Sequence, residues 1–163
     1  TNKRRLQQEY DFPPKNYDAC AGQYNVEYLN QPSVQTAIHA KRTYWLDCSF
    51  EIVLGYSIES MLTPMEPIYN WLITNAPELR ITIVSGDDDS VCGSLGTQSW
   101  IFNMSYNVDP SFNFIPWIHN NQVSGYITKF MNAFNFITVH SAGHLIPQTQ
   151  PSRSLAVLQK YIN

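Results

Sequence analysis

The sequence predicts an α/β fold, the end of a mostly parallel sheet with flanking helices, from three observations. Two β-branched apolar runs, 80–86 and 134–143, have the pattern of strands, and a polar loop follows each. Residues 94–103 and 151–163 follow these loops and have helical patterns. The chain has 163 residues and is 44% apolar, enough to bury a core. We therefore expect strand, loop and helix twice in succession, separated by a hairpin.

Helices are predicted ahead of the first strand. Pro32 has the position of a first helical residue within 30–40. The stretch 48–62 is more helical than extended, and 63–77 begins with a Thr cap followed by Pro64. The apolar residues of this last stretch fall on one helical face: Ile68, Trp71 and Leu72.

Between the two main strands, residues 112–130 read as two strands around an Asn120-Asn121 turn. Pro116 marks an edge strand or a bulge, because proline cannot donate to a sheet. The final helix at 151–163 carries one apolar stripe: Leu155, Leu158 and Ile162.

Composition excludes several classes of function. Charged residues make up 14% of the chain and the net charge is −3, with no basic patch for nucleic acid. No apolar run approaches the length of a membrane span. The three consecutive Asp residues lack the alternating pattern of a calcium loop, and no His or Cys pair has metal-ligand spacing. We expect no metal or cofactor. A surface this poor in charge and rich in aromatic residues suggests that part of it is covered.

Two polar loops carry the candidate chemistry. Parallel strands gather functional groups at their carboxyl edge, so the loop 87–92 and the loop 140–147 share one rim. A histidine and a carboxylate on neighbouring strand ends are two thirds of a hydrolase triad, and here Asp89 precedes His144 as in α/β-hydrolases. The sequence has no Gly-x-Ser-x-Gly elbow, so the serine is missing. Alternatively, Asp87 only caps the turn, the adjacent acids only solvate the loop, and His144 is structural.

The other histidines, His39, His119 and His140, are predicted to be structural, because each sits in an apolar or aromatic segment without a nearby acid. The three cysteines form an odd set. They are either reduced cytosolic thiols or, in an oxidising compartment, at least one is free or paired outside the chain. The sequon at Asn103 favours secretion and is a candidate glycosylation site.

Longer motifs resemble the serine carboxypeptidases, the family of vacuolar, plant and lysosomal carboxypeptidases. The two that carry most of the resemblance are VSGDDDSVC (84–92), followed by Gly96-Thr97, and TVHSAGHLIPQTQP (138–151). Further resemblance lies in YLNQPSVQTAIHA (28–40), W-x-x-C-S (45–49) and PWIHNNQVSGYITKF (116–130). The similarity covers about residues 17–163. It implies the C-terminal part of an α/β-hydrolase fold, completed by a separate N-terminal chain.

The resemblance implies roles for individual residues. Asp89 becomes the triad acid and His144 the general base, while Asp87 supports the loop and Asp88 faces solvent. Residues matching the family's substrate pockets are Cys92, a free thiol, Val91 and Met61 near the pocket for the penultimate side chain, and Leu145 beside the pocket for the departing residue.

The resemblance also implies a partner. Residues 1–16, which include Lys3-Arg4-Arg5, look like a linker remnant left by proteolytic cleavage of a zymogen. The N-terminal large chain of the same precursor would hold the serine, and Cys20 and Cys48 would form disulfides with it, leaving Cys92 free. A lysosomal, vacuolar or secreted glycoprotein is expected, and a homodimer is compatible with it.

The implied activity is removal of C-terminal residues from peptides through an acyl-enzyme, with residues 17–163 as the C-terminal part of the catalytic domain. Two alternatives stay open. One is an acyltransferase or lyase that uses the same acid and base, and the other is a non-catalytic protective or binding partner.

Overall fold

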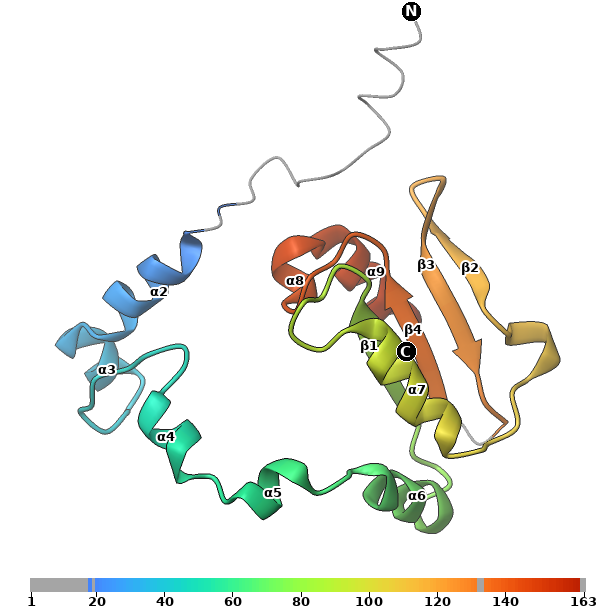
Figure 1. Ribbon diagram of the computed structural model, residues 1–163. Helices are drawn as coiled ribbons and strands as arrows, with labels where there is room; N and C mark the ends of the chain where they lie inside the picture. The colour runs from blue at the N-terminus through green and yellow to red at the C-terminus, as the bar shows by residue number, and fades with distance from the viewer. Residues whose placement is uncertain (1–17, 19, 132–133, 162–163) are drawn as a thin grey trace, which may run out of the picture. The chain divides into compact units, whose positions relative to one another are not determined.

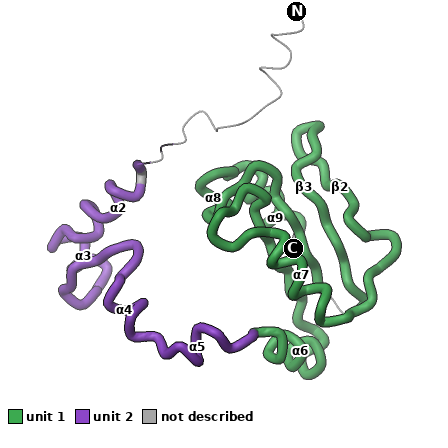
Figure 2. Tube along the Cα trace, in the orientation of Figure 1, with its two compact units in different colours: residues 1–17, 65–163 green, residues 18–64 purple. Residues whose placement is uncertain are grey.

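The computed structural model describes residues 18, 20–131 and 134–161. These residues form two compact units, 18–64 and the part of the chain from Met65 onward (Figure 2). The expected linker remnant at 1–16 lies outside the described residues.

The secondary structure of the unit 18–64 consists of helices. Its helices are α2 (Ala21–Leu29), α3 (Pro32–Ala37), α4 (Phe50–Gly55) and α5 (Ile58–Leu62). The helices predicted within 30–40 and 48–62 are confirmed, and Pro32 is the first residue of α3. Ser49 and Ser57 cap α4 and α5 by accepting backbone N–H groups three residues ahead. Helix α2, which no local signal predicted, begins after Cys20, whose side chain makes no capping hydrogen bond.

Side-chain amides connect the loops of this unit. Gln35, only 6% exposed, donates to the carbonyls of Leu29 and Thr43 at 3.0 and 2.8 Å. Asn30 exchanges two hydrogen bonds of 2.8 Å with the backbone of Trp45. Buried amides are stable only when they are hydrogen-bonded, and these contacts hold the segment after α3 against the α2–α3 turn.

The second unit contains a four-stranded sheet (Figure 1). The strands are β1 (Ile81–Gly86), β2 (Ile115–His119), β3 (Gln122–Lys129) and β4 (Phe134–Val139), in the order β1-β4-β3-β2. The helices are α6 (Glu66–Asn75), α7 (Ser94–Asn103), the short 3₁₀ helix η1 (Pro110–Phe112), α8 (Ile146–Thr149) and α9 (Pro151–Tyr161). The predicted order of strand, helix, hairpin, strand and helix is confirmed, and the fold is α/β.

Strands β1 and β4 are parallel, with Gly86 paired to Val139 at their carboxyl ends. This pairing confirms the predicted common rim. Strand β1 forms one edge of the described sheet, and most of its residues are partly exposed. Central strand β4 is the well-buried one.

The hairpin is as the sequence predicts. Asn120 and Asn121 both have positive φ, 50° and 59°, which matches the primed turns that favour asparagine between two antiparallel strands. Pro116 lies in the edge strand β2. The register shifts after Trp117, opposite Gly125, whose φ of 142° and contact with the β4 backbone exclude a side chain.

Each face of the sheet has its own core, with α7 on one face and α9 on the other (Figure 1). Alternate residues of β4 point to opposite faces, as the period of two requires. Phe134 and Phe136 pack with Ile101 of α7, whereas Ile137 and Val139 pack in the cluster that contains Val157 of α9. The two clusters fix β4, and therefore the loop that follows it.

Two predicted details are wrong. Helix α6 begins at Glu66, not near Thr63, because Pro64 keeps Thr63 extended and the Thr63 hydroxyl donates to Glu59 in the preceding helix. Strand β4 ends at Val139, before the chain turns at Ser141 with a φ of 57°.

The predicted final helix is confirmed as α9. Leu155 and Leu158 of the predicted stripe are 54% and 48% exposed, and Ile162 lies outside the described residues. The helix packs on the sheet through Ala156 and Val157. Leu155 and Leu158 therefore form an apolar face that the described sheet does not cover. None of the helices in the described part of the chain is long and apolar enough to cross a bilayer.

Candidate active site

The site lies where β1 and β4 end side by side. Beyond Gly86, the strand pairing continues into the loops: the N–H of Asp87 donates to Val139 at 3.1 Å, and the N–H of Asp88 donates to Ala142 at 3.0 Å. The acidic loop (87–92) and the histidine loop (140–147) are therefore joined through backbone hydrogen bonds.

Gly86 permits this close approach. A Cβ atom there would stand 2.2 Å from the carbonyl oxygen of Ala142 and 2.7 Å from that of Gly143, far inside van der Waals contact. The glycine of the Gly-Asp-x-Asp motif is thus required by the histidine loop, which occupies the space of its missing side chain.

Asp89 faces His144, as the sequence predicts for the pair. The Oδ2 atom of Asp89 lies 3.0 Å from Nδ1 of His144, and the Asp89 side chain is 6% exposed while that of His144 is 50% exposed. The other oxygen, Oδ1, accepts the N–H groups of Val91 and Cys92 at 2.8 and 2.9 Å. The turn after Asp89 therefore fixes the carboxylate, and one oxygen is left to orient the imidazole.

The hydrogen bonds also set the charge of this carboxylate. The N–H of Cys92 lowers the pKa of Asp89 below its ordinary value of 3.8, and His144 and the N–H of Val91 act in the same direction, against the opposing effect of desolvation. The stabilisation that these contacts give the folded chain is complete above the ordinary pKa and is lost as the pH falls through the lowered one. Asp89 therefore stays ionised in mildly acidic solution.

Because Nδ1 of His144 faces Asp89, Nε2 is the nitrogen that remains for a reacting group. The His144 ring is half-exposed, so a reacting group can approach it from the solvent side. The pair has the geometry of the acid and the base of a hydrolase triad.

A cavity of about 240 Å³ adjoins the pair. Asp89, Cys92 and His144 line it together with the aromatic pair Tyr69 and Trp100, whose rings stack at 5.2 Å. Cys92, one of the residues predicted to line a substrate pocket, therefore lines this cavity. The aromatic wall was not predicted, because Tyr69 belongs to α6 and approaches the site only through tertiary packing.

The remaining predicted pocket residues lie elsewhere. Val91 and Leu145 are 71% and 59% exposed and stand outside the lining of this cavity. Met61, 58% exposed, belongs to the unit 18–64. Their pocket roles stay predictions.

One premise of the expectation for His140, that no acid lies near it, is wrong. Its Nδ1 lies 2.5 Å from Oδ2 of Asp87, so an acid that is remote in sequence becomes its partner. Asp87 also accepts the N–H of Ser141 at 2.6 Å, in agreement with the implied loop-supporting role, and Asp88 is exposed. His119 contacts the hydroxyl of Ser152 at 2.8 Å.

The predicted modification sites are exposed. Cys20, Cys48 and Cys92 carry free, exposed thiols in the chain taken alone. Asn103 is exposed at the last position of α7, and the hydroxyl of Ser105 donates to its carbonyl at 3.3 Å. Among the described residues, no three His, Cys, Asp or Glu side chains form a group that could hold a metal ion.

An α/β sheet that brings an acid and a histidine together at the ends of neighbouring strands is typical of the α/β-hydrolase class. The profile of the serine carboxypeptidase family matches residues 1–163. The chain belongs to the serine carboxypeptidase family.

Relatives from Arabidopsis thaliana agree with this assignment. The chain is 32% identical over 154 residues to serine carboxypeptidase-like 33, covering 91% of this chain and 30% of that protein. It is 34% identical over 164 residues to serine carboxypeptidase-like 41, covering 97% of this chain and 34% of the relative. The chain thus spans about a third of the length of the curated relatives it matches.

A solved structure supports the fold. Kex1Δp, a prohormone-processing carboxypeptidase from Saccharomyces cerevisiae, matches with a TM-score of 0.70 and 20% identity. The match covers 86% of this chain and 31% of the yeast chain. The described sheet and helices therefore correspond to a part of a serine carboxypeptidase fold.

Proposed function

We propose that this chain supplies the acid and the base of a serine carboxypeptidase, an enzyme that removes C-terminal residues from peptides. The observation that carries the proposal is the 3.0 Å contact between Asp89 Oδ2 and His144 Nδ1 beside a cavity. Family membership supports the class of reaction, because the acid and the base stand on the two family motifs.

In the proposed reaction, a serine hydroxyl on the proposed large chain attacks the last peptide carbonyl while Nε2 of His144 takes its proton. His144 then gives this proton to the departing amino acid, which leaves an acyl-enzyme. Water, activated by the same nitrogen, hydrolyses the ester. Asp89 stabilises the imidazolium in each step, and its lowered pKa keeps it ionised for this purpose in an acidic vacuole or lysosome.

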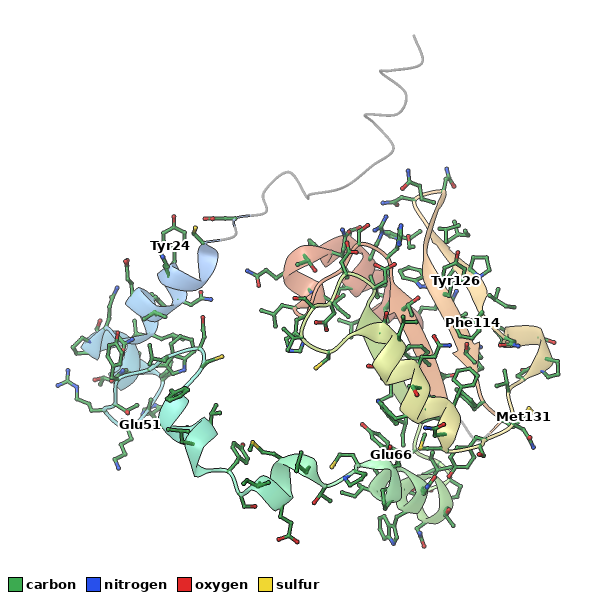
Figure 3. All side chains as sticks on the ribbon, in the orientation of Figure 1. Tyr24, Glu51, Glu66, Phe114, Tyr126 and Met131 are labelled. Atoms are coloured by element: carbon green, nitrogen blue, oxygen red, sulfur yellow. The ribbon has the colours of Figure 1, made fainter. Side chains whose placement is uncertain are left out.

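The partner in this proposal is the N-terminal large chain of the same precursor. Three observations support it. The chain spans about a third of its relatives, and β1 forms an edge of the described sheet, open to a further strand. The helices of the unit 18–64 expose large apolar side chains, among which Phe50, Ile58 and Leu62 are 73%, 72% and 75% exposed. Figure 3 shows the side chains of this unit, with Glu51 of α4 labelled.

We expect two disulfides to hold the chains together through Cys20 and Cys48, which are exposed in this chain. On a gel without reductant, the wild-type chain should run with the large chain, and a reductant should release it. The Cys20→Ser, Cys48→Ser double variant should run alone, whereas Cys92→Ser should behave as wild type. Migration of the wild-type chain by itself without reductant would refute the pairing.

Labelling with a serine-directed phosphonofluoridate tests the proposed activity. In the two-chain protein, the serine of the large chain should be labelled, and His144→Ala should abolish the labelling because the serine loses its base. Absence of label on the wild-type protein would favour the protective or binding role. Labelling without release of C-terminal residues would favour an acyltransferase or lyase.

A further inference from the structure

A second carboxylate and histidine stand beside the first pair. The parallel register that pairs Gly86 with Val139 places the next residues, Asp87 and His140, opposite each other. Their side chains meet at 2.5 Å, between Oδ2 and Nδ1. The catalytic geometry needs only the pair that lies two residues further along the acidic loop, so the mechanism leaves this contact unexplained.

The contact is one of several hydrogen bonds that hold the start of the histidine loop in place. Oδ1 of Asp87 accepts the N–H of Ser141, while Arg153 donates to the carbonyl of His140 at 2.6 Å and the buried Gln150 donates to that of Ser141 at 3.1 Å. Ser141 has a φ of 57°, which L-residues seldom adopt. Such a conformation persists only where neighbouring contacts hold it.

The strained turn lies three residues before His144 and determines how the chain enters the loop that carries it. The His140 ring itself is 56% exposed. A surface pair that did nothing else would contribute little to stability. Here both partners act on the same strained turn, so the contact restricts where His144 stands.

We propose that Asp87 and His140 form a clamp that positions His144 relative to Asp89, which makes them positioning residues for the proposed reaction. The clamp rests on the proposed function, because the histidine that it holds is the proposed base. Arg153 completes the clamp from α9, by holding the carbonyl of the residue whose ring Asp87 binds.

The test compares variants of the two-chain protein with a peptide substrate. His140→Ala should lower kcat by about 10- to 100-fold, since a displacement of about 1 Å in a catalytic group costs that much. KM should stay near the wild-type value, because the ring does not line the cavity. His140→Asn, whose amide can donate to Asp87, should restore most of the loss, whereas His140→Leu should not.

A double-mutant comparison and a control variant make the test more specific. The effects of Asp87→Asn and His140→Ala on kcat should be strongly non-additive, because both substitutions disturb the same contact between the two side chains. The contact of His119 with the hydroxyl of Ser152 is a comparable exposed histidine contact that involves neither Asp87 nor His140, so His119→Ala should leave kcat unchanged. Amide hydrogen exchange should be faster at Ser141 in His140→Ala and unchanged in His119→Ala.

The outcomes separate the two proposals. Wild-type kcat in His140→Ala, or equal loss in the Asn and Leu variants, would overturn the clamp. If the wild-type protein neither binds the phosphonofluoridate nor turns over peptide, the proposed function fails, and hydrogen exchange still tests the clamp. Unchanged exchange at Ser141 in His140→Ala would then refute it.

Discussion

Replacing Asp89 with Asn in the two-chain protein is expected to lower turnover by about four orders of magnitude, as for other triad acids. The structure gives the reason. Oδ2 of Asp89 accepts from Nδ1 of His144, and an amide group there would present a donor to that nitrogen and favour the wrong tautomer. The measurement is kcat with a peptide substrate, after the variant has been shown to assemble with the large chain.

Asp88→Asn is the matched control, because Asp88 is the adjacent residue of the same loop. The substitution removes the same charge from the loop. Its side chain is exposed, and the N–H that joins it to Ala142 is retained in the variant. We expect turnover within about twofold of wild type, in line with the small effects of most surface substitutions. Equal losses at the two positions would overturn the assignment of Asp89.

Gly86→Ala is expected to impair both folding and turnover. The new methyl group would stand 2.2 Å from the carbonyl oxygen of Ala142, which is backbone and can only move together with the histidine loop. Overpacking of this kind costs about 1–3 kcal/mol of stability. The shift of the loop should also lower kcat by about 100-fold. Thermal unfolding and steady-state kinetics of the two-chain protein measure the two effects.

Gly96→Ala is its control, because a Cβ at Gly96 in α7 meets no atom of the described chain within 4 Å. Alanine is favoured over glycine inside a helix by about 0.5–1 kcal/mol, so stability should be unchanged or slightly higher. A Gly86→Ala protein that matched wild type in both measurements would show that the two loops do not meet as closely as described.

Local signals predicted the elements correctly where the local sequence was unambiguous. The β-branched run of β1, the helix α7 and the Asn120-Asn121 turn all appear at the predicted places. The start of α6 was misplaced because Pro64 keeps Thr63 extended and the Thr63 hydroxyl donates to the carbonyl of Glu59 in the preceding helix. Distant residues decide which face of α9 is buried, because Val157 packs in a cluster with residues of the sheet.

The sequence by itself determined the two loops and the chemistry available at each. An acidic run after one strand and a histidine after another are two thirds of a hydrolase triad, in the order of the α/β-hydrolases, and the resemblance of the two motifs implies the family. The separate roles of Asp87 and Asp88 followed only from the resemblance. Neither the spacing nor the composition indicated that His140 has an acid as its partner.

The pairing of Asp89 with His144 was already implied by the resemblance, but only the tertiary structure showed that Asp87 faces His140. The parallel pairing of Gly86 with Val139 aligns Asp87 with His140, and the turn after Asp89 directs its free oxygen to His144. Residues more than fifty positions apart meet through a strand register, and that register is set by the packing of β4 between two helical layers. A register of this kind depends on non-local contacts, which no local pattern in the sequence records.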